Sequence, residues 1–353
     1  MLQILSNQHS INVATLPLQK RAAWVNIVIY AVLGFWSLVC LFPLYWVVVT
    51  SFKGESEIIE GPFYLPFVDF TPTLKSWVAT LTYSNDHLVS RFYNSTIVAI
   101  SATLLTVSFG GMAVYGLTRF RYDVRWKRLV LFFLAAIFAG IAFVVPTVWL
   151  QFLFTLATAL LLFSAVMLRQ TGLTIGNEGI LFALLATRIL PPIVVVLPLF
   201  MMGFYTHTLD THIPLIFSYT ASNLPVAIWL LLPVFGKFAT SQEEAAQLDG
   251  ASRISIFFTI FLPMVAASTA AVGLLIFVLC WNEYLFAAYL ASDSVSTMPP
   301  WVIGQMSIKE AQVGGDSQEW PQLSAAMIFM VLPVLACAGF AQRYLSRLVG
   351  KGL

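Results

Sequence analysis

The chain has 353 residues, of which 59% are hydrophobic and only 10% are charged, and its mean hydropathy is +0.86. Because soluble domains carry about 25% charged residues, this composition excludes an ordinary soluble protein and indicates a chain whose apolar surface also faces lipid. The net charge of +2 is too small to favour a nucleic-acid partner. The three cysteines, Cys40, Cys280 and Cys337, lie far apart in apolar runs, and this spacing does not indicate a disulfide or metal framework.

Eight apolar segments are long enough to be transmembrane helices, since a bilayer core takes about 20 residues per helix. In chain order they are Trp24–Val49, Asn94–Leu117, Leu129–Val148, Phe152–Leu168, Ile180–Phe204, Pro214–Phe235, Ala266–Leu290 and Leu323–Phe340. The first segment is not followed by a signal-peptide cleavage site, so it is expected to remain as a span. The third and fourth are joined by a few residues around Pro146, so they predict a tight helical hairpin. The sequence therefore predicts an all-α polytopic membrane protein with about eight transmembrane helices.

The charges between these segments fix the expected orientation, because cytoplasmic loops carry an excess of Lys and Arg. If all eight segments span, the following basic residues fall on one side: Lys20, Arg21, Arg119, Arg121, Arg125, Lys127, Arg128, Arg169, Lys237, Arg253, Arg343, Arg347 and Lys351. The opposite loops carry the acids Glu55, Glu57, Glu60, Asp69, Asp86, Asp293, Asp316 and Glu319. We therefore expect both termini in the cytoplasm.

Two outer loops, residues 51–91 and 291–322, are longer than a connection needs and are rich in proline and aromatic residues. Aromatic side chains are typical of the headgroup level of a membrane, so interfacial packing is one interpretation. A surface that meets an extracytoplasmic partner is the other, and the sequence leaves both open.

The loop between the sixth and seventh segments predicts a helix–turn–helix on the cytoplasmic surface. Ser241, followed three residues later by Glu244, forms a capping box that starts a short helix. Gly250 tolerates a left-handed backbone and ends that helix. Ala245 and Ala246 allow close approach by whatever docks there. On these patterns alone, an ordinary interfacial loop with a capped helix is the competing interpretation.

A second helix is expected to start at Ser252, and Pro263 is expected to mark the turn into the next span. Helical spacing predicts one apolar face for this second helix, packed on the bundle and formed by Ile254, Phe257, Phe258 and Phe261.

The spacing of this loop resembles a known signature. Glu244-Ala245-Ala246, three residues, Gly250, nine residues and then Ile260-Phe-Leu262-Pro263 resembles the EAA signature of permeases in binding-protein-dependent ABC importers. In that family the EAA helix is a coupling helix seated in a cleft of the ATPase subunit. The resemblance implies that the ATPase-coupling residues here are Glu244, Ala245, Ala246, Leu248, Asp249 and Gly250.

Other segments resemble the smaller, six-span subunit of maltose-type carbohydrate permeases. They are Ser51-Phe52-Lys53, Arg188-Ile-Leu-Pro191-Pro192, Leu209-Asp210-Thr211-His212, Asn223-Leu-Pro225 with Trp229, and Trp281-Asn282-Glu283. The chain departs from that family in its abbreviated tail, Gly350-Lys351-Gly352-Leu353, and in residues 129–178, where the family usually passes directly into the next span. We therefore expect a six-helix permease core with an inserted hairpin that fills lipid-facing surface, a gating role being the alternative.

The expected organisation follows from these boundaries. Residues 1–23 form a cytoplasmic segment, residues 24–128 hold two spans with the outer loop at about 51–91, and residues 129–178 form the inserted hairpin. The remaining core takes residues 179–342, with the coupling loop at 236–263, and residues 343–353 form a cytoplasmic tail.

Polar groups inside the spans mark candidates for the transport path, because an ionisable group costs about 2.5–3.5 kcal/mol near the bilayer centre. Asn282 and Glu283, beside Trp281, are expected either to line the translocation path or to form a structural hydrogen bond at a subunit interface. Arg188 is expected to be a snorkelling or structural residue. His207 and His212 lack clustered Cys or carboxylate partners in the sequence, so no metal site is expected.

The sequence contains no GxxxxGK[ST] phosphate loop, no HExxH and no GxSxG, so catalytic residues and a cofactor are not expected in this chain. The resemblance implies a permease subunit of an ABC importer in the bacterial inner membrane, carrying a sugar, polyol or sugar derivative, with ATP and Mg bound by a partner. The implied partners are a second homologous permease, two ATPase subunits and an extracytoplasmic solute-binding protein.

Three alternatives remain. The same family also suggests a permease for a non-sugar solute. An ion-coupled secondary transporter predicts midplane acids and inverted repeats, and a membrane-embedded enzyme predicts a cluster of His or acids at one depth. Neither pattern is evident in the sequence.

Overall fold

A computed structural model of the chain describes residues 23–59, 61, 64–82, 87–122, 124–125, 130–131, 134–135, 155–162, 174–236, 241–310 and 320–349. Most of these residues are helical. The helices are α1 (Ala23–Ser51), α2 (Glu55–Ile59), α3 (Lys75–Thr82), α4 (His87–Arg119), α7 (Asn177–Ala186), α8 (Pro192–Tyr205), α9 (His212–Gly236), α10 (Ser241–Leu248), α11 (Arg253–Ile256), α12 (Leu262–Trp281), α13 (Leu285–Leu290), α14 (Met298–Glu310) and α15 (Trp320–Val349). A 3-10 turn, η2 (Thr187–Ile189), follows α7, and a π-helical turn, η3 (Phe257–Phe261), joins α11 to α12.

Five helical stretches are long and apolar enough to cross a membrane: α1, α4, α9, the continuous run α11–η3–α12, and α15 as far as Gln342. A sixth is complete if α7 with η2 and α8, which meet at 83°, form one broken span. These six correspond to six of the eight predicted segments. The other two, Leu129–Val148 and Phe152–Leu168, lie mostly outside the described residues, although residues 155–162 are helical.

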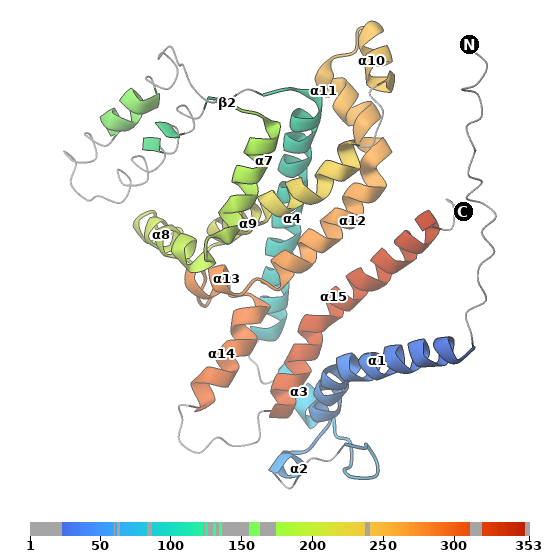
Figure 1. Cartoon of the computed structure of the whole chain (residues 1–353). Helices are drawn as coiled ribbons and strands as arrows, with labels where there is room; N and C mark the ends of the chain where they lie inside the picture. Colours follow the sequence, from blue (N-terminus) through green and yellow to red (C-terminus); the bar gives the residue numbers. More distant parts are fainter. Residues whose placement is uncertain are drawn as a thin grey trace.

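Helix α4 is the centre of the bundle and packs against both α9 and α12 (Figure 1). A β-carbon on Gly110 would lie 3.3 Å from the β-carbon of Ala227, so glycine allows α4 and α9 to approach closely. Helix α1 differs, because none of its most apolar stretch is buried within the chain, and it packs on α15. The bundle therefore has its most buried spans in α4 and α9, whose apolar stretches are 44% and 50% buried, and a peripheral first span.

The two ends of the predicted insertion lie side by side. Strands β1 (Val124–Arg125) and β2 (Thr174–Ile175) pair antiparallel, with Arg125 opposite Thr174. The side chain of Asn177 donates to the carbonyl oxygens of Leu117 and Phe120 at 2.7 Å each. The chain thus leaves the end of α4 and returns to it at the same place, so an intervening segment need not disturb the core.

The predicted fifth span, Ile180–Phe204, is not one continuous helix. Leu190 and Pro191 have extended backbones, with ψ of 130° at both residues. The residue before a proline is disfavoured in the α conformation, and here two residues in succession, Leu190 and Pro191, precede a proline. The proline pair therefore breaks the span and sets the 83° bend.

The predicted seventh span, Ala266–Leu290, also differs from the structure. The helix starts much earlier, at Arg253, and ends at Trp281, after which Asn282 and the next two residues form a break before α13. Pro263 does not make a turn, because it lies at the first turn of α12, where a missing N–H is tolerated.

The segment that follows α1 packs through its aromatic residues. The Trp77 ring lies 5.6 Å from the Phe52 ring and 5.6 Å from that of Phe329 on α15, centroid to centroid. Lys53 is only 2% exposed, with its ammonium 4.4 Å from the centre of the Trp46 ring. Burial lowers the pKa of Lys53, an effect opposed by the nearby carboxylate of Glu57 and then by that of Asp69. These contacts hold the segment after α1 against α1 and α15.

The end of the bundle opposite α10, called here the far end, is closed by a polar clamp around residues 291–298. The Asp210 carboxylate accepts the backbone N–H groups of Ser292, Ser294 and Val295 at 2.9–3.1 Å. Asn94 on α4 donates to the carbonyl oxygens of Ser294 and Ser296, at 3.1 and 3.2 Å. The clamp ties the loop after α13 to α4 and to the loop before α9.

The pKa of Asp210 reflects this clamp. Partial burial acts to raise it, but the three backbone N–H groups favour the carboxylate more strongly and lower the pKa from 3.8 to about 2. Asp210 also has a left-handed backbone, with φ of 57°, which Asp and Asn tolerate better than most residues.

We expect the substitution Asp210→Asn to lower the free energy of unfolding at neutral pH by about 1.5–3 kcal/mol, the value of a hydrogen bond to a charged group. Asn keeps one acceptor oxygen and the backbone preference, but its NH2 group cannot accept the third N–H group, so the change removes the charge and one hydrogen bond. Because the folded pKa is depressed to about 2, the carboxylate stabilises the fold above the unfolded pKa of 3.8, and this contribution is lost as pH falls towards 2. Thermal unfolding in detergent from pH 7 to pH 3 measures both effects, and equal pH dependence in the two proteins would contradict the assignment.

Candidate functional site

Helix α10 stands at one end of the bundle and projects away from it (Figure 1). Of the six residues predicted for coupling, Glu244, Ala245, Leu248, Asp249 and Gly250 are exposed and Ala246 is half-buried. Leu248 is 90% exposed. The helix therefore presents a free face with a small, an acidic and an apolar side chain.

Gly250 ends α10 as predicted. Its φ is +85°, its N–H donates to the carbonyl of Gln247, and the next N–H, of Ala251, donates to the carbonyl of Ala246. This pair of bonds is a Schellman motif, in which the left-handed position favours glycine. A side chain at position 250 would strain the turn even though space is open around it.

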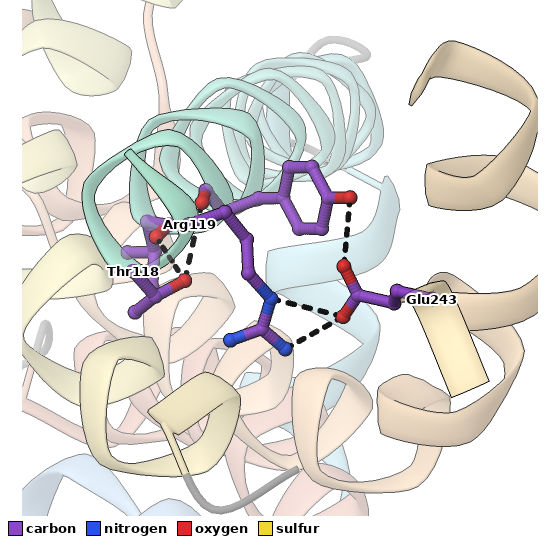
Figure 2. A network of polar contacts seen from close by, with 5 residues as sticks. Thr118, Arg119 and Glu243 are labelled. Atoms are coloured by element: carbon purple, nitrogen blue, oxygen red, sulfur yellow. Dashed lines mark hydrogen bonds and ion pairs between the residues drawn. The ribbon is translucent and has the colours of Figure 1, made fainter. Parts of the chain in front are cut away.

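The carboxylate that fixes α10 to the bundle is Glu243, the residue before the predicted Glu244. Glu243 is 4% exposed, and its Oε1 accepts Nε and Nη2 of Arg119 at 2.9 and 2.6 Å (Figure 2). Its Oε2 accepts the hydroxyl of Tyr115 at 3.0 Å. Arg119 is the last residue of α4, so α10 is joined to the central helix by a buried ion pair.

An aromatic cluster lies beneath the ion pair. The Tyr115 ring lies 5.0 Å from the rings of both Phe257 and Phe261, and the Phe235 ring lies 4.7 Å from that of Phe261. The guanidinium carbon of Arg119 lies 5.3 Å from the centre of the Phe261 ring, within the range of a cation–π interaction. The cluster shields the pair from solvent and joins α4, α9 and η3.

The second helix of the loop starts at Ser252 as predicted, where the hydroxyl accepts the N–H of Ser255 at 3.2 Å. The predicted apolar face was wrong in part, because Ile254 and Phe258 are 73% and 56% exposed. The buried residues are Ile256, Phe257 and Phe261. The cause is the π-helical turn η3, in which the Leu262 N–H bonds to the Phe257 carbonyl and one extra residue rotates the buried face.

Two of the three residues predicted for the transport path support the chain break after α12. The Trp281 ring is 2% exposed and its Nε1 donates to the carbonyl of Met330 at 2.9 Å. Oε1 of Glu283 accepts the N–H groups of Leu285 and Phe286, at 3.0 and 3.2 Å, which caps α13. Asn282 is exposed, and its amide donates to the carbonyl of Val278 at 2.9 Å.

Arg188 lies at the bend between α7 and α8 rather than at the end of a span. Its side chain is exposed, and Nη2 lies 3.4 Å from Oδ1 of Asn223 on α9. Asn223 is 3% exposed and donates to the carbonyl of Tyr219 and to the sulfur of Cys280. Among the described residues, no group of three or more His, Cys, Asp or Glu could hold a metal ion.

The chain has several apolar spans, one of which is broken and has polar residues at its bend. It also has a surface helix held on the central span by an ion pair. These features define a polytopic membrane transport protein. Residues 173–351 match the family described as binding-protein-dependent transport system inner membrane component. The chain belongs to this family. It is therefore a permease subunit of an ABC importer, a transport component rather than an enzyme.

Two relatives can be aligned with most of the chain. It is 26% identical over 309 residues to the trehalose/maltose transport system permease protein MalG of Thermococcus litoralis, covering 88% of this chain and 89% of the relative. It is 27% identical over 324 residues to the diacetylchitobiose uptake system permease protein NgcG of Streptomyces coelicolor, covering 92% and 87%.

The fold is also similar to a chain in the crystal structure of a bacterial ABC transporter involved in the import of the acidic polysaccharide alginate. The TM-score is 0.58 and the sequence identity is 18%, over 91% of this chain and 96% of the other. At this identity the similarity supports the fold.

The substitution Arg119→Met tests the ion pair, because it leaves the Glu243 carboxylate buried without its cation. We expect a loss of about 3–5 kcal/mol in the free energy of unfolding, measured by thermal or denaturant unfolding in detergent. Adding Glu243→Gln should recover part of the loss, since no charge is then buried. Arg121→Met, an exposed arginine two residues further on, is the control and should change stability by less than about 0.5 kcal/mol. If both arginine substitutions cost the same, the pair does not stabilise the fold.

Proposed function

We propose that the free face of α10 is the surface on which a separate ATPase subunit binds. The observation that carries this proposal is the division of α10 into two sides. Glu243 on one side is buried in an ion pair with α4, while Glu244, Ala245 and Leu248 on the other side are exposed. A short helix that is held on the core by one side keeps its other side available to a partner.

Movement of α10 would be transmitted to two spans, α4 and α12. The Glu243–Arg119 pair connects it to α4, and chain continuity through α11 and η3 connects it to α12. Closure of the ATPase subunits would displace α10, and α4 and α12 would move with it as parts of one packed body. This gives a physical route from ATP hydrolysis to alternating access, with ATP and Mg bound by the ATPase and not by this chain.

The solute we propose is a sugar, polyol or sugar derivative, because the named relatives are permeases for trehalose or maltose and for diacetylchitobiose. A non-sugar solute of the same family is the alternative. The assembly would contain a second homologous permease, two ATPase subunits and an extracytoplasmic solute-binding protein. The chain would lie in the bacterial inner membrane with both termini and α10 in the cytoplasm, as the loop charges indicate.

Of the three predicted path residues, we propose that Asn282 lines the translocation path. It is exposed directly after the span that ends at Trp281, and its amide has hydrogen-bonding capacity beyond the bond to Val278. Trp281 and Glu283 would maintain the break through their bonds to Met330 and to the start of α13.

The substitutions Glu244→Lys and Gly250→Asp test the docking surface. The first reverses a charge on the free face, and the second adds a charged side chain beside it at φ +85°, where a side chain is strained. We expect each to abolish co-purification of the ATPase subunit and ATP-dependent uptake of radiolabelled maltose, trehalose or diacetylchitobiose, whichever the unsubstituted transporter carries. Glu178→Lys, an exposed acid at the start of α7, is the matched control and should preserve both. Survival of both activities in the α10 variants would show that the coupling surface lies elsewhere.

We further propose that residues 129–178 contain a hairpin of two additional spans at the periphery, giving eight spans in all. The pairing of β1 with β2 supports this, as does the start of the family match at residue 173. Replacing residues 126–173 by Asn-Gly would join Arg125 to Thr174 through a two-residue hairpin turn, since these residues already face one another. We expect the shortened chain to assemble with its ATPase and to retain uptake. An assembled transporter without uptake would instead assign the segment a gating role.

A further inference from the structure

The bend between α7 and α8 holds a cation at the middle depth of the bundle. The guanidinium of Arg188 lies 3.4 Å from the side-chain oxygen of Asn223. Asn223 is eleven residues from the start of α9 and thirteen from its end. At about 1.5 Å per residue, these positions are about 16 and 20 Å from the two ends of the helix. Arg188 is therefore near the midplane of a bilayer core about 30 Å thick.

This position requires a polar environment for Arg188. Arginine stays charged in proteins, and a charge at the bilayer centre is costly unless it faces water or a partner. Snorkelling serves residues near helix ends, and Arg188 is fixed far from both ends of α9. Among the described residues no carboxylate lies within ion-pair distance of Arg188, and Oε1 of Glu283 accepts the N–H groups that start α13. The described part of the chain thus supplies no ion-pair partner for this guanidinium.

The contact between Arg188 and Asn223 is held in place by further hydrogen bonds of Asn223. Asn223 is 3% exposed, and its amide nitrogen donates to the carbonyl of Tyr219 at 3.0 Å and to the sulfur of Cys280 at 3.4 Å. These bonds orient the amide so that its oxygen faces Arg188. The guanidinium has five N–H donors, and the bond to Asn223 uses one of them, so the group has donor capacity beyond this contact.

The bend itself also indicates a wet environment. Leu190 and Pro191 are extended and all residues from Thr187 to Val195 are exposed in this chain. Backbone that is not helical at membrane depth is tolerated where it is covered by protein or lines a water-filled cavity. Interrupted spans near the midplane are also where transporters commonly place their solute sites.

We propose that Arg188 lies on the solute path at mid-depth and donates hydrogen bonds to oxygen atoms of the solute, with Asn223 as its positioning residue. The proposal rests on the function proposed above. The chemistry fits solutes rich in hydroxyl or carboxylate oxygens and disfavours cationic ones, because the guanidinium has donors, no acceptor and a permanent positive charge. The competing occupant is an acidic side chain of the second permease, which would cover Arg188 in the assembled transporter.

Water accessibility separates these two outcomes. The test uses the assembled transporter in proteoliposomes, with Arg188→Cys in a chain whose native cysteines are replaced, and the probe is the charged thiol reagent sulfonatoethyl methanethiosulfonate. We expect Cys at position 188 to be modified readily. The matched control is the chain that retains only native Cys40, which is exposed at mid-length of α1. It should react roughly 100-fold more slowly, because the reactive thiolate does not form in hydrocarbon. Absence of modification at position 188 would show that lipid or the second permease covers it, and would overturn the proposal.

A transport measurement adds a readout that a purely structural role would not move. Arg188→Gln should lower the maximal uptake rate of the labelled sugar roughly tenfold, the effect of losing one hydrogen bond to a charged group, and Arg188→Lys should restore part of it. Arg121→Gln, an exposed arginine outside the spans, is the control. Equal uptake by the Gln and Lys variants would contradict a donor role that depends on the positive charge, because both side chains donate and only Lys is charged. If the unsubstituted transporter shows no ATP-dependent sugar uptake, the proposed function fails, whereas the accessibility result at position 188 can still be obtained.

Discussion

The buried ion pair between Arg119 and Glu243 is the interaction on which the α10 end of the molecule depends. Taking two charges out of water is costly, and the cost is recovered only where every polar atom is satisfied. Here the carboxylate accepts two N–H groups of Arg119 and the hydroxyl of Tyr115, and the guanidinium lies against the Phe261 ring. Helix α10 is only eight residues long and would not persist alone. The pair gives it a fixed position on α4 while its other side remains free.

The middle of the bundle is organised around two breaks in helical structure that both contact α9. One break, between α7 and α8, places Arg188 beside Asn223. The other, between α12 and α13, places the Glu283 carbonyl 3.3 Å from the hydroxyl of Tyr219, one helical turn away from Asn223. At the far end the Asp210 clamp holds the loop after α13 against α4. Rigid contacts at both ends of the bundle thus enclose a middle region in which polar groups and irregular backbone are concentrated.

The sequence was sufficient for the fold class, six of the spans, the short helix at Ser241 and its end at Gly250, because apolar length and capping residues are local signals. It was insufficient for Glu243, since periodicity does not show which of two adjacent acids turns inward. It also missed the π-helical turn, which moved Ile254 and Phe258 out of the buried face. The pair Pro191-Pro192 could have revealed the break in the fifth span, whereas the depth of Arg188 follows only from its contact with Asn223 on another helix. The assignments of the coupling and path residues stay predictions.

The central claim is that α10 and α4 move as one body during transport. Spin labels at Ser241→Cys on α10 and Met112→Cys on α4, both exposed positions, measure this distance by pulsed electron resonance in the assembled transporter. The distance should stay constant within about 2 Å between the nucleotide-free and vanadate-trapped states, as for helices within a packed unit. A second pair, Ser241→Cys with Leu335→Cys on α15, monitors movement relative to the periphery. A change of about 5 Å or more between α10 and α4, the size of a one-turn shift, would contradict rigid coupling through the Arg119–Glu243 pair.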